Sequence, residues 1–411
     1  MISVMLKKYY SLLLLVWGVS LLSGCSEKSN PTFDQQNFAS IFDNSKFDAS
    51  YFPIDMRETP DGGYIVLGGR RLSENSDFAG IYLLKADKYG KFVKEIEVPA
   101  STGVYPVGKL MEYQTKYYFF CMDAQSLQAQ IANVDALLEA VSVTPVQGDL
   151  TYPAAASFAN NNFILLSYNN NDKLSVISVL NTDGGILKSK GYDIGVGSDD
   201  QIITEKYVIE HYLRTGRQWP FEAGVMANGL YYFNGFYNYT FSLVFTNASS
   251  DEPSNVAQGQ SDKGGLSGVS YLGANKFALS RFSYGNNYFL PGKDIPGGDP
   301  ASSDFGGFTL PELVPDAPVK ILQAKTDTKN ALVYASNTKS KQIGLYFYEQ
   351  ETGTFISSRY LGFSNPYEIA SLIQTSDGGL AVCGTTYLAG RFPRICIFKI
   401  SKDELSGQLD K

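Results

Sequence analysis

Histidine is almost absent from this chain of 411 residues, which contains His211 alone. Histidine-rich metal sites are therefore excluded, and His211 has no carboxylate nearby in the sequence at a spacing typical of a catalytic triad. The Gly-Val-Gly sequence at 195–197 lacks the third glycine and the helix of a dinucleotide site. Residues 336–339 fit the S-x-x-K pattern, but they lie at the end of an expected strand and not at a helix start. These motifs predict no catalytic residue, no metal site and no cofactor.

Charged residues are also scarce, at 18% of the chain, and acidic residues outnumber basic ones to give a formal net charge of −7. An acidic protein of this kind is not expected to bind nucleic acid or to dock electrostatically on anionic lipid. The apolar run from 9 to 22 is too short to span a bilayer comfortably. Because Lys7 and Lys8 precede it, this run is typical of a secretory signal.

The apolar run ends in Leu-Ser-Gly-Cys at 22–25, which resembles the bacterial lipobox. The resemblance implies that Cys25 is diacylated on its sulfur and becomes the mature N-terminus, so that lipid holds the protein at a membrane. The alternative is a plain signal peptide with a cysteine there by chance. Ser26 follows where the inner-membrane retention signal has Asp, so an outer-membrane location is expected, with the leaflet left open. The domains expected are a lipoprotein signal peptide at 1–24, the lipidated Cys and a tether at 25–37, and one folded domain at 38–411.

Only three cysteines remain after lipidation of Cys25. Cys383 and Cys396 fall on neighbouring expected strands, and a hairpin centred between residues 389 and 390 places them directly opposite each other. Cross-strand neighbours are close enough to be candidates for a disulfide. The alternative is that both are small core residues, because Leu67 and Tyr82 occupy the matching places in an earlier copy of the same unit.

Aromatic and turn residues are abundant, with 28 Tyr, 26 Phe and 39 Gly, a composition that favours an extracytoplasmic all-β protein. The sequence Asp-Gly-Gly followed by an apolar run occurs at 61–69 and returns at 377–384. Gly tolerates positive φ, so Asp-Gly-Gly suits a tight turn before a buried strand. A third strand follows each copy, at 81–85 and 395–399. The unit is therefore an antiparallel meander.

Weaker copies of this unit fill the chain between these two. An X-Pro pair, in which Pro holds its predecessor extended, stands ahead of six expected first strands. The six prolines are Pro53, Pro106, Pro153, Pro220, Pro318 and Pro366. A seventh unit lacks Pro but keeps its turn at 273–275. Seven units of about 50 residues predict a single β-propeller of seven four-stranded blades. A β-sandwich, the alternative, does not require so regular a period.

The Asp-Gly-Gly copies resemble the T-x-D-G-G-[YF]-[IV]-[IV]-x-G repeats of bacterial, Bacteroidetes-like outer-membrane β-propeller lipoproteins. The residues that carry the resemblance are Thr59 to Gly63 and Thr375 to Gly379. The resemblance implies a blade and no activity. Few residues remain after the last third strand, only 404–410 for an outer strand. We therefore expect Phe38–Phe42 to supply the outer strand of the last blade and close the ring.

Two long insertions, 199–218 and 284–315, are expected on the face that carries the inter-blade links, and long loops in compact domains are commonly functional. Aromatic faces beside polar groups suit sugars, peptides or an aromatic chelate. The candidate ligand-binding residues are Trp219, Arg214, Arg217, His211, Tyr237, Tyr239, Tyr288 and Phe289.

Two hypotheses about function follow. In the first, a non-enzymatic outer-membrane lipoprotein binds a ligand or partner through one propeller face, as an accessory to nutrient uptake. Its partners would be an outer-membrane transporter or a glycan or peptide ligand, with no nucleic acid. In the second, a hydrolase acts on glycans through carboxylates contributed by distant blades.

Overall fold

The computed structural model describes residues 37–43, 49–71, 77–195, 203–260, 263–327, 329–388 and 392–411. The chain divides into two units, Met1–Gln36 and Asn37–Lys411. The signal peptide, Cys25 and the tether up to residue 36 lie outside the described residues, so the expectations about them stay predictions. No helix in the described ranges is long and apolar enough to cross a membrane.

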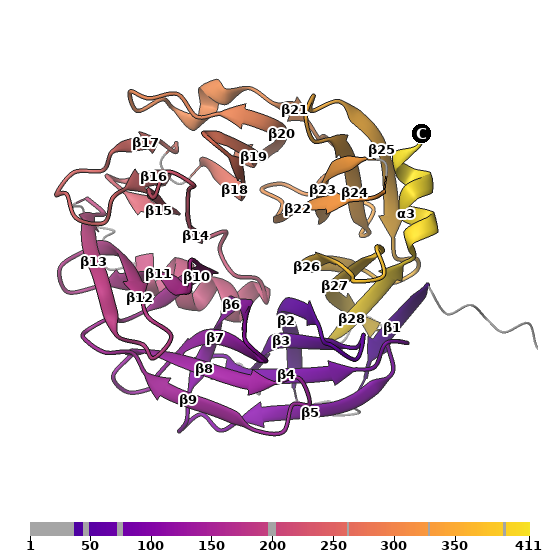
Figure 1. The fold of residues 1–411 in the computed structure, drawn as a ribbon, viewed down its shortest axis with the longest axis horizontal. Helices are drawn as coiled ribbons and strands as arrows, with labels where there is room; N and C mark the ends of the chain where they lie inside the picture. The colour runs from indigo at the N-terminus through magenta and orange to yellow at the C-terminus, as the bar shows by residue number, and fades with distance from the viewer. Residues whose placement is uncertain are drawn as a thin grey trace, which may run out of the picture. The chain divides into compact units, whose positions relative to one another are not determined.

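Residues 37–411 form a β-propeller, as predicted, whose described strands group into seven four-stranded antiparallel blades (Figure 1). Blades 1 and 2 are joined into one sheet by a single bridge, Gly80 opposite Val104. Blade 1 contains β2 (Ser50–Glu58), β3 (Tyr64–Arg71), β4 (Gly80–Ala86) and β5 (Phe92–Val98), and blade 2 contains β6 (Val104–Tyr113), β7 (Lys116–Met122), β8 (Ala129–Asp135) and β9 (Val141–Pro145). Blade 3 contains β10 (Pro153–Ala159), β11 (Asn162–Asn169), β12 (Leu174–Leu180) and β13 (Ile186–Asp193), and blade 4 contains β14 (Glu222–Val225), β15 (Tyr231–Tyr237), β16 (Thr240–Thr246) and β17 (Asn255–Ala257).

The remaining three blades follow the same order. Blade 5 contains β18 (Gly264–Gly273), β19 (Lys276–Ser283), β20 (Asn286–Asp294) and β21 (Phe308–Thr309), and blade 6 contains β22 (Val319–Lys325), β23 (Asn330–Asn337), β24 (Ile343–Glu349) and β25 (Phe355–Leu361). Blade 7 contains β26 (Tyr367–Gln374), β27 (Leu380–Tyr387), β28 (Pro393–Ile400) and β1 (Phe38–Phe42). The innermost strands surround a common axis, and β26 of the last blade lies beside β2 of the first (Figure 1).

The first strand of the described chain closes the ring, as predicted. β1 pairs antiparallel with β28, from Phe38 opposite Lys399 to Phe42 opposite Ile395. The ring of Phe38 meets that of Tyr64 in blade 1 edge-on, with centroids 6.1 Å apart. Residues after β28 form no strand but the helix α3 (Lys402–Leu409), which begins at Ser401, whose hydroxyl accepts a hydrogen bond from the Glu404 N–H at 3.3 Å. The outer strand of blade 7 thus comes from the opposite end of the chain.

The Thr-x-Asp-Gly-Gly repeat holds a buried lysine of the third strand. In blade 1 the Asp61 carboxylate accepts hydrogen bonds from the Gly63 N–H at 3.0 Å and from the Lys85 ammonium at 2.9 Å. The Lys85 side chain is only 3% exposed, although Asp61 is half exposed. In blade 7 the Lys399 ammonium donates to Asp377 at 2.8 Å in the same way. The Thr-x-Asp-Gly-Gly motif therefore links the turn before the second strand to the third strand of the same blade.

This contact makes Asp61 unusually acidic. Burial raises the pKa of its carboxyl, but hydrogen bonds from Thr59, Lys85 and the Gly63 N–H outweigh that effect and lower the pKa to about 2. Because the pKa in the folded state lies below the ordinary value of 3.8, the contact stabilises the fold fully above about pH 4. Its contribution is lost as the pH falls from about 4 toward 2.

The two partners of this contact are expected to respond differently to substitution. Asp61→Ala leaves the buried Lys85 ammonium without its carboxylate and should lower the free energy of unfolding by about 2 kcal/mol. Lys85→Met removes the buried charge itself and leaves Asp61 in water, so its loss should be less than half as large. Urea unfolding at pH 7 measures both. A larger loss for Lys85→Met than for Asp61→Ala would refute this account.

The predicted register of the last hairpin is wrong, and so is the possible disulfide that depended on it. Cys396 pairs with Gly384, and Cys383 pairs with Ile397, so the hairpin differs by one residue from the expected register. Successive side chains alternate between the faces of a strand, and this shift separates the two thiols. Both cysteines are free and buried in different core clusters, so Cys383 and Cys396 form no disulfide. Both are small core residues, which was the alternative to a disulfide.

The predicted insertion at 284–315 is not one loop. Its first part forms β20, the third strand of blade 5, directly after a tight turn at Tyr284 and Gly285. The extra residues come later, at 295–307 around the short helix η2 (Ser302–Phe305), and at 310–318 before β22. Only the second of these segments is an inter-blade link. The predicted insertion at 199–218 is an inter-blade link, and its described part contains η1 (Ile203–Glu210) and α2 (His211–Thr215).

Candidate functional site

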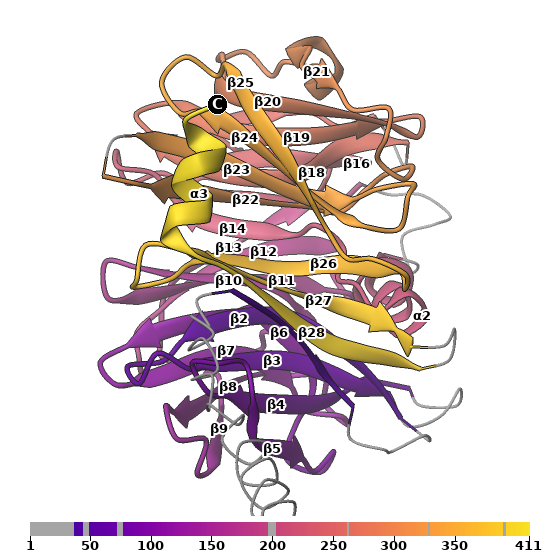
Figure 2. The ribbon, with the colours of Figure 1, turned by 90° about the vertical axis from the view of Figure 1, so that its right-hand side faces the viewer.

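The insertion before blade 4 is fastened to blades 1 and 2. The buried Tyr105 hydroxyl of β6 donates a hydrogen bond to the Val208 carbonyl, and the Tyr212 hydroxyl donates to the Phe52 carbonyl at 3.3 Å. A Cβ on Gly69 would lie 2.1 Å from the Tyr212 hydroxyl oxygen, so β3 needs glycine where this ring packs. Figure 2 shows α2 at the end of the blades to which the arrow of β27 points. Because β27 starts at an Asp-Gly-Gly turn, α2 lies on the opposite face, as predicted.

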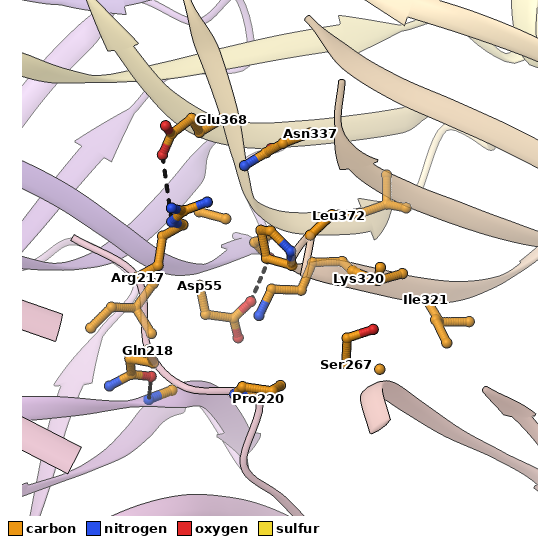
Figure 3. A pocket seen from close by; sticks show the side chains of 18 of the residues that line it. Asp55, Arg217, Gln218, Pro220, Ser267, Lys320, Ile321, Asn337, Glu368 and Leu372 are labelled. Carbon is orange, nitrogen blue, oxygen red and sulfur yellow. Dashed lines mark hydrogen bonds and ion pairs between the residues drawn. The ribbon is translucent and has the colours of Figure 1, made fainter. Parts of the chain in front are cut away.

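A cavity of about 950 Å³ lies among the inner strands. All seven inner strands contribute to its wall, together with residues 217–221 and the link at 314–318. Figure 3 shows part of this wall, with Asp55, Ser267, Lys320 and Glu368 from four of the inner strands. Its volume is at the upper end of the range for small-molecule sites. Since side chains from every blade line one space, the cavity exists only in the closed ring.

Three of the predicted site residues come together at this cavity, namely Trp219, His211 and Arg217. The Trp219 ring packs against that of His211 with centroids 5.0 Å apart, and its buried indole N–H has no hydrogen-bond partner. Burial, with Arg217 and Arg214 nearby, lowers the pKa of His211 to about 4, so its imidazole is neutral at physiological pH. The Arg217 Nε lies 3.7 Å from the Glu368 carboxylate. The expected aromatic and polar character of this insertion is therefore present.

The other five predicted residues do not line the cavity. Arg214 and Tyr239 are exposed away from it, and Tyr237 packs edge-on against Tyr192 in blade 3. Tyr288 lies under the Arg281 guanidinium, 3.7 Å from ring centroid to carbon. Phe289 is fully buried and stacks on Tyr334, with centroids 4.5 Å apart. The prediction that Phe289 meets a ligand is wrong, because its strand directs this ring into the core between blades 5 and 6.

Several polar residues of the cavity lie on inner strands and were missed. They are Asp55 on β2, Glu222 on β14, Lys320 on β22 and Glu368 on β26. A signal for them exists, because each stands two residues after the Pro of an X-Pro pair. Each of these charged residues also stands between two apolar residues near the start of its expected strand, where a charge is not expected. The same X-Pro marks that indicate the blades therefore also locate the cavity wall.

Asp55 joins three blades at the inner edge of the ring. Its carboxylate accepts hydrogen bonds from the Leu110 N–H of blade 2 at 2.8 Å and from the Ser371 hydroxyl of blade 7 at 2.5 Å. Arg57 of its own strand lies 3.3 Å away. Because both oxygens already have partners, the role of Asp55 in the cavity is structural.

Two donors on blade 6 face the cavity without partners. The Lys320 side chain makes no hydrogen bond or ion pair with any residue that the structure describes. The Lys320 side chain is exposed to the cavity; desolvation by the surrounding strands lowers its pKa, Lys109 adds to this shift, and the carboxylates of Asp55 and Glu222 oppose it. Asn337 is 3% exposed; its amide oxygen accepts from the Ile369 N–H at 2.7 Å, whereas its amide nitrogen has no partner. Both side chains point into the cavity in Figure 3.

The described residues contain no group of three or more His, Cys, Asp and Glu side chains that could hold a metal ion. Burial raises the pKa of the cavity carboxyl Glu368, although Arg217 lowers it. The arrangement is thus suited to binding a polar molecule, with one carboxyl that retains its proton more readily than usual.

Comparison with protein-family models and with curated proteins gives no match. Among solved structures, the chain is similar to the β-propeller domain of the Trilobed protease from Pyrococcus furiosus, at 9% identity over 85% of this chain and 93% of that one, with a TM-score of 0.45. It is also similar to the Dos1 propeller, at 7% identity over 85% of this chain and 92% of that one, with a TM-score of 0.47. These similarities concern the fold and carry no argument about function.

Proposed function

We propose that this protein binds a small polar molecule in its central cavity and does not transform it. The observation that carries the proposal is the cavity of about 950 Å³, to which all seven inner strands and the insertion before blade 4 contribute. An aromatic ring, that of Trp219, stands beside unpartnered hydrogen-bond donors in its wall. A concave site with few convergent polar groups is typical of ligand binding.

We further propose that the propeller is held at the outer membrane by lipid on Cys25 and serves there as an accessory to nutrient uptake. The support for this location is the sequence at the N-terminus, with its two lysines, short apolar run and lipobox-like ending. A binding protein anchored at that membrane could deliver its ligand to an outer-membrane transporter.

The anchor is tested by one substitution. Cys25→Ala should release the protein from the membrane fraction or leave it unprocessed, because the sulfur that carries the diacyl group is missing. Membrane fractionation and metabolic labelling with palmitate measure this. Unchanged fractionation together with unchanged labelling would show that the resemblance to a lipobox is accidental.

Ligand binding is tested by comparing two aromatic residues. A screen of sugars, peptides and organic acids by thermal shift identifies a ligand, since binding to the folded state raises its melting temperature. Trp219→Ala should then weaken binding five- to tenfold, through the loss of about 1 kcal/mol of ring stacking at the cavity wall. Tyr64→Ala, at a core residue 1% exposed, should instead lower stability by about 3–5 kcal/mol and leave the affinity of the folded protein unchanged.

Trp219 also packs against Tyr207, Phe241 and Phe282, so binding by its variant is measured well below its melting temperature. If Trp219→Ala unfolds the domain while the affinity of the remaining folded protein is unchanged, the indole is a packing residue and not part of the site.

The raised pKa of Glu368 favours a second candidate function, a glycan-acting hydrolase with this carboxyl as general acid. Chromogenic glycosides distinguish the two functions. Turnover that Glu368→Gln abolishes would establish the hydrolase and refute a purely binding role, whereas no turnover on a panel that includes a confirmed ligand would refute the hydrolase.

A further inference from the structure

The carboxylates and amides that line the cavity largely have partners already. The Asp55 oxygens accept from blades 2 and 7, and the Glu222 carboxylate accepts from the Lys109 ammonium. The Gln218 amide donates to the Pro106 carbonyl at 2.8 Å and accepts from the Gly108 N–H at 3.3 Å. These acceptors have little capacity left for a ligand.

Three donors of the cavity, in contrast, have free hydrogen-bonding capacity. Lys320 has three N–H groups and no hydrogen bond or ion pair within the described part of the chain, and the Asn337 amide nitrogen is buried without a partner. Arg217 has one carboxylate neighbour, Glu368, at 3.7 Å, which is beyond hydrogen-bond length. The buried Asn337 amide nitrogen is costly without an acceptor, and the Lys320 ammonium, on an exposed side chain, is free to pair with an anion, so a ligand that brings acceptors is favoured here.

The strand register places two of these donors together. Lys320 of β22 lies opposite Ala335 of β23, and Asn337 is two residues further along β23. Side chains two residues apart on a strand share a face, so Lys320 and Asn337 are diagonal neighbours on one face of the sheet. The backbones of such diagonal residues lie about 7–8 Å apart. The Asn337 amide is held in place by the Ile369 N–H, whereas the long Lys320 side chain can rotate to bring its ammonium to the same carboxylate. Figure 3 shows the Arg217 guanidinium on the Asn337 side of the same space.

We propose that the ligand of this cavity is a small monocarboxylic acid, whose carboxylate binds the Lys320 ammonium and the Asn337 amide N–H, with Arg217 as a further donor. This inference rests on the proposed binding function and specifies its ligand class. An ammonium–carboxylate hydrogen bond is roughly twice as strong as a neutral one, and the incoming anion supplies the partner that Lys320 lacks. The rest of the molecule would lie along the rings of Trp219 and Phe282, which line the same cavity.

The negative groups around the donors argue for a single charge on the ligand. The Asp55 and Glu222 carboxylates act on Lys320, and Glu368 lies beside Arg217. A phosphate dianion would meet repulsion from these three groups, whereas a monoanion needs only the Lys320 ammonium to balance its charge.

Matched pairs of an acid and its neutral amide test the inference on the mature protein, with binding measured by calorimetry. The pairs are glucuronate with glucuronamide and phenylacetate with phenylacetamide. Inorganic phosphate is a separate probe. At least one acid should bind ten times or more tightly than its amide. Lys320→Met should weaken binding of that acid at least tenfold, and Lys320→Arg should restore much of it. Asn337→Asp keeps the acceptor for Ile369 but replaces the free donor with an anion, and should weaken binding at least as much.

Lys325→Met is the control, because Lys325 is exposed on the same strand and does not line the cavity. It should leave binding unchanged. Equal binding of acid and amide, or full affinity in Lys320→Met, would overturn the carboxylate assignment while the binding function stands. Tighter binding of phosphate than of either acid would overturn it as well. Failure of every probe, acid and neutral alike, would count against both the inference and the binding function.

Discussion

A chain that begins at Ala49 should unfold at a markedly lower temperature than the mature protein, because blade 7 loses its outer strand. Removal of β1 exposes the edge of β28 over five paired positions. It also removes Asp43, whose carboxylate lies 3.0 Å from Arg394, a residue with a side chain only 3% exposed. With about 1 kcal/mol for each lost hydrogen bond and for the packing of Phe38, the loss of stability should be on the order of 5 kcal/mol.

Two further chains separate strand loss from simple shortening. A chain that begins at residue 33 keeps β1 and should melt like the mature protein, since residues 26–32 are expected to be only a tether. Ser40→Pro in the full chain removes an N–H from the middle of β1 and should reproduce part of the loss. Equal melting temperatures for the chain from Ala49 and the mature protein would refute closure by this strand.

Asp55→Ala should be the most destabilising single substitution among the cavity residues, with a loss of about 3–5 kcal/mol. It leaves the Leu110 N–H and the Ser371 hydroxyl without an acceptor and deprives Arg57 of its carboxylate. Asp55 is 7% exposed, so water replaces these contacts poorly. The contacts join blade 1 to blades 2 and 7, and their loss weakens the joint between the first and last blades from the inside.

Urea unfolding followed by circular dichroism measures this effect, with two comparisons. Asp55→Asn keeps one acceptor oxygen and should give an intermediate loss. Asp149→Ala, at an exposed position in the loop before blade 3, should change stability by less than about 0.5 kcal/mol. If Asp55→Ala is no more destabilising than Asp149→Ala, the carboxylate does not hold the three blades together.

Most of the strands were predictable because their signals are local. The expected third strands at 81–85 and 395–399 lie within β4 and β28, and 38–42 forms β1. Periodic X-Pro pairs and turn residues indicated the repeat, and the outer strand expected for the last blade at 38–42 is β1, which pairs with β28. These arguments depend on the alternation of turns and strands along the sequence, which tertiary packing does not alter.

The register of a single hairpin was not predictable. A shift of one residue between β27 and β28 separates Cys383 from Cys396, and the sequence around the connecting loop favours neither register clearly. Similarly, residues 284–315 were predicted to be a long insertion that offers Phe289 to a ligand, yet Phe289 enters the core because it fits between blades 5 and 6. Packing against a neighbouring blade decides such positions.

The sequence by itself determined the propeller, its number of blades, the strand that closes it and the face that carries the insertion with Trp219, His211 and Arg217. Only the tertiary structure decided which polar residues meet. Asp55, Lys320 and Glu368 are separated by up to about 300 residues, yet they line one cavity because the ring brings the same position of each inner strand to the axis. A repeat can be recognised from local periodicity along the sequence. Contacts across the centre of the ring form only when all the blades are closed into a circle, and the sequence of a single repeat does not determine them.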